Sequence, residues 1–145
     1  MSYLPEDMPA PAPTLDTEEW WESCRRRELR FQKCRDCGTL RHPPSPLCPS
    51  CHSLAYDWHP SAGRGRVYSF TWVHHVFLPG LEGRVPYNVA VIVLDDAPGI
   101  RLVSNVLDVT PAALHIDLPV RLVWEAAGPF TLPRFQVGTL VRSVT

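Results

Sequence analysis

Residues 34–51 read CRDCGTLRHPPSPLCPSC and contain four of the five cysteines of the chain. These four form two C-x-x-C pairs, Cys34 with Cys37 and Cys48 with Cys51. Two such pairs on facing loops bring four sulfurs to one tetrahedral site, for which Zn²⁺ is the usual metal. Because four thiolates leave no open coordination position, the pattern predicts a structural metal and not a catalytic one. Iron in a rubredoxin-like site is a less favoured alternative, and two disulfides or four unrelated cysteines are the others.

The composition excludes several classes of protein. The 145 residues suffice for a small metal module and one compact domain. With 14 Lys and Arg against 15 Asp and Glu, the chain has no basic half that would attract a nucleic-acid backbone. The N-terminus lacks the regions of a signal peptide, and residues 89–94, the longest aliphatic run, are too few to span a membrane. Metal-binding cysteines without an export signal indicate a cytoplasmic protein.

A helix is expected over residues 15–30. Asp16 is the predicted N-cap, and Glu19 three positions later would complete a capping box. Leu15 and Trp20 fall at the two positions of a hydrophobic staple. These signals together predict where the helix begins.

The two adjacent tryptophans of this helix, Trp20 and Trp21, cannot both face one narrow stripe, so one of them is a candidate for a partner surface. The alternative is that both pack on their own domain. Cys24 lies at helical spacing from Trp20 and is expected to be a small packed residue, not a fifth ligand. Residues 1–14 are rich in Pro and Ala, which predicts a flexible or extended arm that could lie along a partner.

The remaining chain is expected to be β. Residues 31–60 are expected to form the metal module, with a strand at residues 56–58 as its last element. His42 is expected at the surface or beside the ligands. Thr110 and Pro111 predict the start of a short helix. Residues 61–145 are expected to form a five-stranded OB-fold barrel, with that helix between the third and fourth strands. The five expected strands are residues 67–78, 87–95, 100–107, 120–126 and 135–144.

The order of motifs resembles one family over about residues 16–144. The motifs are WWE, LRFQKCRDCG, PPSPLCPSC, SAGRGRVYSFTWVHH, PYNVAVIVLDD and LPRF. Paired knuckles occur in many ribbons, but this combination is similar to the family called domain of unknown function thirty-five. The resemblance implies an N-terminal helix, a rubredoxin-like zinc ribbon and an OB-fold. By matching position, it also implies that Cys34, Cys37, Cys48 and Cys51 bind the metal.

The resemblance implies a partner and not a reaction of the chain's own. Members of the family serve thiolase-superfamily enzymes, either as separate subunits or fused to acyl-CoA hydratases. In archaea they bridge thiolase and hydroxymethylglutaryl-CoA synthase and help to form the CoA channel; in actinobacterial steroid side-chain degradation they pair with a thiolase-like retro-aldolase. Lys33 is the only lysine, and an Arg- and Ala-rich, Lys-poor composition favours the actinobacterial setting. The expected function is a non-catalytic accessory subunit that stabilises its partner and helps to form the acyl-CoA site.

Signals for chemistry of the chain's own are weak. His74 and His75 are neighbours in the expected first barrel strand, and neither has a Ser, Cys or carboxylate beside it in the sequence. Residues 95–96 fit a hairpin turn, and Asn105 could bind a ligand or satisfy a backbone group. The candidates for contact with the partner or with a CoA thioester, several of them in or beside the loop at residues 79–86, are Trp20, Trp21, Arg64, Arg66, His74, Phe77, Arg84 and Tyr87.

Two other functions compete with the accessory role. OB-folds and zinc ribbons also bind single-stranded nucleic acid, and base stacking is available from Tyr68, Phe70, Trp72 and Phe77. Such proteins need a positive groove, whereas residues 66–145 hold equal numbers of acidic and basic side chains. An autonomous acyl-CoA hydrolase or carrier is the third alternative, and it lacks a base–nucleophile pair.

Overall fold

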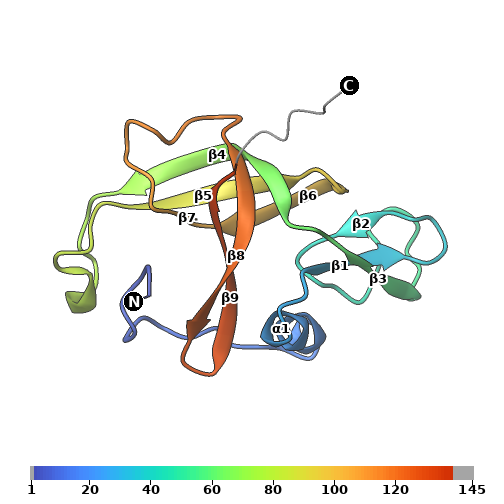
Figure 1. Cartoon of the computed structure of the whole chain (residues 1–145). Coiled ribbons are helices and arrows are strands. Elements are labelled where there is room, and N and C mark those ends of the chain that lie inside the picture. The colour runs from blue at the N-terminus through green and yellow to red at the C-terminus, as the bar shows by residue number, and fades with distance from the viewer. Residues whose placement is uncertain (1, 139–145) are drawn as a thin grey trace.

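The computed structural model describes residues 2–138, with a three-stranded sheet, a six-stranded sheet and one α-helix beside them (Figure 1). The predicted class is confirmed: the chain is mainly β, with an N-terminal helix, a zinc ribbon and an OB-fold. The elements are α1 (Glu18–Arg25), β1 (Arg30–Cys34), β2 (Leu40–Arg41), β3 (Tyr56–Pro60), β4 (Arg64–Val73), η1 (Pro79–Leu81), β5 (Tyr87–Leu94), β6 (Ala97–Ser104), β7 (Val106–Leu107), β8 (Pro119–Ala127) and β9 (Phe130–Val137).

The small sheet is antiparallel in the order β2-β1-β3 and forms the ribbon. β1 lies in the middle and buries Phe31 completely. Gln32 is also buried, and its side-chain oxygen accepts a hydrogen bond from the Ser45 amide at 2.8 Å, which fastens the proline-rich loop to the sheet. The expected strand at residues 56–58 is confirmed as part of β3.

The large sheet has the order β6-β5-β4-β8-β9-β7, six strands where five were expected. The expected third strand divides at the buried residue Asn105. Before this point β6 pairs with β5, and after it β7 pairs in parallel with β9. The Asn105 carbonyl accepts the Phe135 amide at 3.0 Å, so the division transfers the chain from one neighbour to the other. The last expected strand begins earlier, at Phe130, and its residues 139–144 lie outside the described residues.

The first barrel strand is shorter than predicted. β4 ends at Val73, which pairs with Tyr87 at the start of β5, and the chain then leaves the sheet. His74, His75 and Phe77 are therefore exposed loop residues, and the placement of the histidines within a strand was wrong. The apolar content of this stretch predicted a strand, but the structure provides no neighbour with which these residues pair.

The expected helix after Thr110 is a single turn. The Leu114 amide donates to the Thr110 carbonyl at 3.1 Å, but a second turn follows at once and Leu118 donates to His115. The Val67 amide then donates to the Leu118 carbonyl at 3.0 Å, which returns the chain to β4. The connection is too short for the cap signals to propagate into a helix.

The helix α1 begins later than the cap signals predicted. Its N-cap is Thr17, not Asp16, and Leu15 is 90% exposed, so neither the predicted capping box nor the staple forms. The Thr14 amide donates to the Thr17 hydroxyl oxygen at 2.8 Å instead. Cys24 is fully buried, as predicted, and burial raises its pKa to about 12.

One core joins all the parts. Trp20 of α1 and Phe31 of the ribbon belong to the same buried cluster as Val67, Ile92 and Phe135 of the barrel. α1 packs against β9 and lies between the β8–β9 hairpin and the ribbon (Figure 1). The helix therefore bridges the two sheets.

Asp96 fastens the connection between ribbon and barrel. It lies in the tight turn between β5 and β6, which confirms the hairpin expected at residues 95–96. Its carboxylate accepts hydrogen bonds from the Ser61 hydroxyl at 2.6 Å and from the Ala62 amide at 2.7 Å. Beyond this connection, a Cβ atom at Gly65 would lie 2.1 Å from the Val93 carbonyl oxygen, so β4 approaches β5 too closely there for any other residue.

The N-terminal arm lies on the barrel of its own chain (Figure 1). The Ser2 hydroxyl and the Tyr3 amide donate to the Glu125 carboxylate at 2.9 and 3.1 Å. The Tyr3 phenol oxygen accepts two hydrogen bonds from Asn88, from its backbone and its side-chain nitrogens, both at 2.9 Å. The arm is therefore anchored at its first described residues to β5 and β8.

Candidate functional site: a four-cysteine metal centre and the surfaces around it

The four cysteines converge as the spacing predicted. Their sulfurs all lie within 4.8 Å of one another, and none forms a disulfide. Sγ of Cys34 lies 3.4 Å from Sγ of Cys51, and Sγ of Cys37 lies 3.6 Å from Sγ of Cys48. A zinc tetrahedron with Zn–S bonds of about 2.3 Å has edges of about 3.8 Å, so the sulfurs are spaced for one Zn²⁺. The set has no room for a water or substrate ligand, and the metal is structural.

Backbone amides favour the thiolate form of two of the four cysteines, Cys34 and Cys48. The Cys37 amide donates to Sγ of Cys34 at 3.4 Å, and this bond is the main cause that lowers the pKa of Cys34 to about 6. The Cys51 amide lowers the pKa of Cys48 in the same way. Amides directed at the first sulfur of each pair favour the thiolate, which is the form that binds zinc. Gly38 follows the first pair with φ +77°, the left-handed step expected after a metal knuckle.

His42 is not one of the clustered metal ligands. Its ring packs against Trp20 with centroids 5.0 Å apart and against Phe31 with centroids 5.4 Å apart. Burial lowers the pKa of His42 to about 4, so the ring is neutral at neutral pH. His42 therefore belongs to the apolar contact between the helix and the ribbon, and the expected surface position was wrong.

The two tryptophans both pack on their own domain. Trp20 is 5% exposed, and Trp21 meets it edge-on with ring centroids 4.9 Å apart and ring planes at 82°. Trp21 is half-buried and continues to Phe130 on the barrel. Because the two rings meet edge-on, both adjacent tryptophans can pack at one interface. The expectation that only one of them could face the domain did not take this arrangement into account.

Arginines gather on the outer face of the barrel sheet. Arg64 pairs with Arg121 across β4 and β8, and Arg66 lies in one row with Val93 and Arg101 across β4, β5 and β6. All four arginines are exposed, and among the described residues none forms an ion pair.

Tyr68 adds an aromatic ring to this arginine face. The Arg101 guanidinium lies 4.3 Å from its centroid, and Tyr68 is 46% exposed. The equal numbers of charges in residues 66–145 concealed this local excess. The signal that could have found Arg101 and Arg121 is their alternation with buried apolar residues, which places them on one face of a strand.

The other predicted contact residues lie in or beside the loop between β4 and β5, and only some of them are exposed. Phe77 is 53% exposed and His74 is exposed at the same end of the barrel. Arg84 instead donates to the Ser2 carbonyl at 3.2 Å, and Tyr87 is 8% exposed. Leu81 in η1 is fully buried, and Gly80 and Arg84 contact the N-terminal arm, whereas residues 74–77 are exposed.

A buried polar network had not been predicted from the sequence. Asn88 is fully buried, and its side chain donates to the Val106 carbonyl at 2.7 Å and accepts the Val106 amide at 2.8 Å. The Asn105 side chain donates to the Asn88 carbonyl and accepts a hydrogen bond from Arg134. Asn105 therefore satisfies backbone and side-chain groups, the second of its expected roles.

Three serine hydroxyls donate to carboxylates, Ser2 to Glu125, Ser53 to Asp36 and Ser61 to Asp96. Within residues 2–138 no Ser, Thr or Cys side chain is hydrogen-bonded to a histidine, and the side-chain hydrogen bonds of the histidines go to backbone carbonyls.

Comparison with known proteins supports these assignments. A family model described as the ChsH2 rubredoxin-like zinc ribbon domain matches residues 21–57, and one described as the ChsH2 C-terminal OB-fold domain matches residues 58–125. A chain of the solved structure "Ltp2-ChsH2(DUF35) aldolase" is 40% identical with a TM-score of 0.81, and the match covers 90% of this chain and 100% of that one. The chain belongs to the ChsH2 (DUF35) family. The four clustered cysteines are therefore the structural zinc site of this ChsH2-family ribbon.

Two curated relatives are longer proteins. The "Probable enoyl-CoA hydratase alpha subunit" of Thermomonospora curvata is 43% identical over 129 residues, which are 88% of this chain and 39% of the relative. The "3-oxo-4,17-pregnadiene-20-carboxyl-CoA hydratase alpha subunit" of Mycobacterium tuberculosis is 36% identical over 121 residues, which are 83% of this chain and 37% of the relative. This ChsH2-family chain thus spans about two fifths of the length of both. Its described part has no helix with the length and hydropathy needed to cross a bilayer.

Proposed function

We propose that this chain is a non-catalytic accessory subunit of a thiolase-like acyl-CoA enzyme. One observation carries the proposal: the match to the ChsH2 (DUF35) chain of an aldolase structure extends over the whole of that chain. The described residues add a closed metal centre and no nucleophile hydrogen-bonded to a histidine, which fits a supporting subunit. The catalytic groups would all come from the partner, which is a thiolase or a retro-aldolase.

The contact with the partner would use the exposed stretch at residues 74–77. Val76 and Phe77 are 36% and 53% exposed, and an exposed aromatic residue beside a second apolar side chain is typical of an interface anchor. His74 lies two residues before Val76. In this proposal Arg84 and Tyr87 support the loop from inside, because Arg84 holds the arm and Tyr87 is buried.

The arginine face would meet the CoA thioester. The phosphates of CoA require guanidinium groups that have no acidic partner of their own, and Arg64 and Arg66 meet that requirement. Steroid side-chain or other acyl-CoA substrates are the class we propose, supported by the pregnadiene-carboxyl-CoA named for the Mycobacterium tuberculosis relative. The hydratase names of both curated relatives make an acyl-CoA hydratase a further proposed partner.

Co-expression with a thiolase-like aldolase tests the proposal. We expect the two chains to purify together and the partner to lose activity and solubility when expressed alone. Phe77→Asp should abolish co-purification, because a carboxylate would be buried without a counterion. Ile116→Asp is the matched control, since Ile116 is also 53% exposed but lies in the turn before β8. A partner that is equally active and stable without this chain would overturn the proposal.

Single-stranded nucleic-acid binding is a second candidate function, and the arginine face with Tyr68 is the observation that favours it. The net charge of −1 opposes it. Titration of the purified chain with a labelled single-stranded oligonucleotide at two salt concentrations separates the functions. Binding that weakens steeply with salt supports nucleic-acid recognition, and no binding at low salt excludes it.

A further inference from the structure

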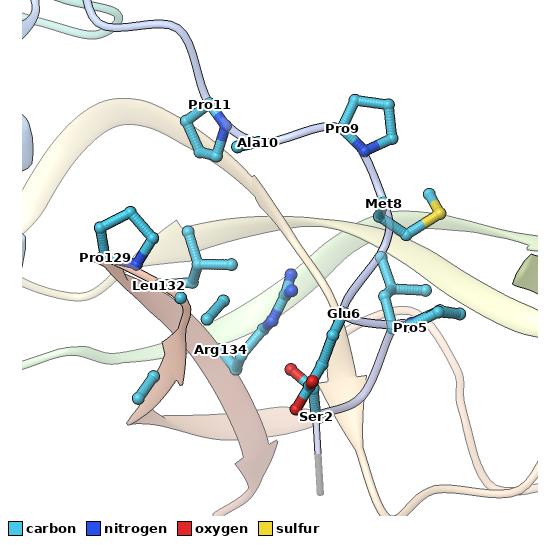
Figure 2. Close-up of a pocket in the computed structure, with 14 residues that line it drawn as sticks. Ser2, Pro5, Glu6, Met8, Pro9, Ala10, Pro11, Pro129, Leu132 and Arg134 are labelled. Carbon is cyan, nitrogen blue, oxygen red and sulfur yellow. The ribbon is translucent and has the colours of Figure 1, made fainter.

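The arm and the β8–β9 hairpin enclose a cavity of about 390 Å³ (Figure 2). The hairpin side consists of residues 126–129 and Leu132. The arm side consists mainly of Leu4, Met8 and residues 9–11. Nearly all of these side chains are apolar, and a cavity of this volume is large enough for a small organic molecule.

Arg134 is the main polar group of the cavity. Its side chain is 11% exposed, and Figure 2 shows its guanidinium directed toward the arm segment at residues 9–11. Nη1 donates to the Asn105 side chain, Nε is buried without a hydrogen-bond acceptor, and Nη2 donates to no group among the described residues. Unlike Nε, Nη2 is not sealed from solvent, so an oxygen atom in the cavity could accept its hydrogen bond.

The charge of the cavity argues against an anion. The Glu125 carboxylate lies 3.6 Å from Nε of Arg134, and its side chain is 13% exposed, so the two buried charges balance. Glu6 adds a second carboxylate at the rim. The charged residues of the lining, Arg134 and Glu6, cancel, and Glu125 beside Arg134 makes the surroundings of a carboxylate or phosphate ligand net negative. A neutral carbonyl oxygen would gain the hydrogen bond without that repulsion.

The arm, which forms one side of the cavity, is held in place by long-range hydrogen bonds. Tyr3 is bound to Asn88, and Ser2 is bound to the same Glu125 carboxylate that balances Arg134. The Asp7 carboxylate lies where a Cβ atom at Gly80 would stand, so the arm also fits closely against η1. The arm is thus fixed to the barrel and to η1 at several points, and it forms one wall of the cavity.

We propose that this arm–hairpin cavity binds a neutral, mainly apolar small molecule that carries a carbonyl oxygen, with Arg134 as the hydrogen-bond donor. Ketones, esters and amides on an apolar skeleton have the required chemistry. The site is formed by this chain alone. It therefore does not depend on the proposed partnership with an acyl-CoA enzyme, and the isolated chain suffices to test it.

Two dyes of opposite character test the proposal. Nile red is neutral, apolar and carries a carbonyl group, whereas anilinonaphthalene sulfonate is apolar but anionic. We expect saturable binding of Nile red at one site, at least tenfold tighter than that of the sulfonate. Amide chemical shifts should change at Ala126, Ala127 and Gly128, which line the cavity. Equal affinity for the two dyes, no saturation, or shifts confined to another region would overturn the proposal.

Substitutions locate the site. Ala10→Trp should fill the cavity from the arm side and weaken Nile red binding at least tenfold. The substitution changes only an exposed arm residue. Arg134→Met should weaken it similarly by removing the donor, although it also removes the bond to Asn105. Leu54→Trp, on the exposed surface of the ribbon, is the matched control and should bind as the parent does. Unchanged affinity in Ala10→Trp would contradict the assignment even if Arg134→Met fails to fold.

Discussion

Trp21 of α1 meets Phe130 at the start of β9 edge-on, with ring centroids 5.5 Å apart and ring planes at 72°. Because Trp20 packs on Trp21 from the other side, a continuous row of aromatic rings runs from the buried core to the β8–β9 hairpin. The helix thereby connects the zinc ribbon with the hairpin that forms the arm cavity. Its position depends on both ends of this row.

The row predicts an energetic coupling between helix and hairpin. Trp21→Ala and Phe130→Ala should each destabilise the fold, and a double-mutant cycle should give a coupling of about 0.5 to 1.5 kcal/mol, as for other edge-on aromatic pairs. Urea unfolding of the four proteins measures it. Leu54→Ala paired with Phe130→Ala is the control, since Leu54 is exposed on the ribbon and should show additive effects. Additive effects for Trp21 and Phe130 would show that the contact is incidental.

His42 predicts a pH dependence of stability. Its pKa falls from 6.5 to about 4 in the folded chain because burial disfavours the charged ring. Since the folded pKa lies below the unfolded one, the unfolded chain binds the proton more readily. Stability is therefore complete above pH 6.5 and decreases as the pH falls toward 4. The loss between pH 7 and pH 5 should be about 2 kcal/mol.

The variant His42→Gln isolates this contribution. Acid also protonates the zinc ligands, but that effect is common to both proteins, so the difference between their free energies of unfolding reports on His42 alone. We expect the variant to be less dependent on pH between 7 and 5. His75→Gln is the matched control, because His75 is exposed. Identical pH profiles for His42→Gln and the parent would contradict burial of a neutral ring.

The sequence was sufficient wherever the signal was local. The C-x-x-C spacing predicted the zinc ligands, and the β-rich segments predicted the barrel strands, because a strand and a metal knuckle are encoded by neighbouring residues. The failures occurred where a local signal competed with tertiary contacts. Thr17 caps α1 although Asp16 fits the pattern, and residues 74–78 have strand composition but no neighbour to pair with.

Contacts between distant residues could not be predicted. Tyr3 lies 85 residues from Asn88, and nothing in the Pro- and Ala-rich arm indicates which barrel residue it meets. The same holds for the row of Arg66 and Arg101, which depends on the register of β5 with both neighbours. Register is a property of the assembled sheet and not of any one strand.

Removing the phenol oxygen of Tyr3 should loosen the N-terminal arm. Tyr3→Phe removes the acceptor of two Asn88 donors, and unsatisfied buried donors cost about 1 to 3 kcal/mol. We expect the arm to detach in part, seen as faster hydrogen exchange at residues 2–13 and faster proteolysis there. Tyr68→Phe is the control, because the Tyr68 ring lies on the exposed sheet face. An arm that exchanges equally fast in the parent and in Tyr3→Phe would show that the anchor does not hold it.

The metal centre predicts the strongest effect. Cys34→Ser should lose zinc, and with it the ribbon, because metal binding supplies about 10 to 16 kcal/mol to a module too small for its own core. Loss of the ribbon removes the packing of His42 on Trp20 and of Phe31 on His42, so α1 should lose its place on the barrel. Because ribbon and barrel share one core, the barrel that carries Phe77 should be destabilised and the partner contact weakened with it. Zinc content, near-ultraviolet circular dichroism and co-purification with the partner measure the three steps. Cys24→Ala is the control and should keep its zinc, since Cys24 is buried in α1 and is not one of the four clustered cysteines. A zinc-free Cys34→Ser chain that keeps the near-ultraviolet spectrum of the parent would show that the ribbon does not position the helix, and one that still assembles with its partner would show that the contact does not depend on the ribbon.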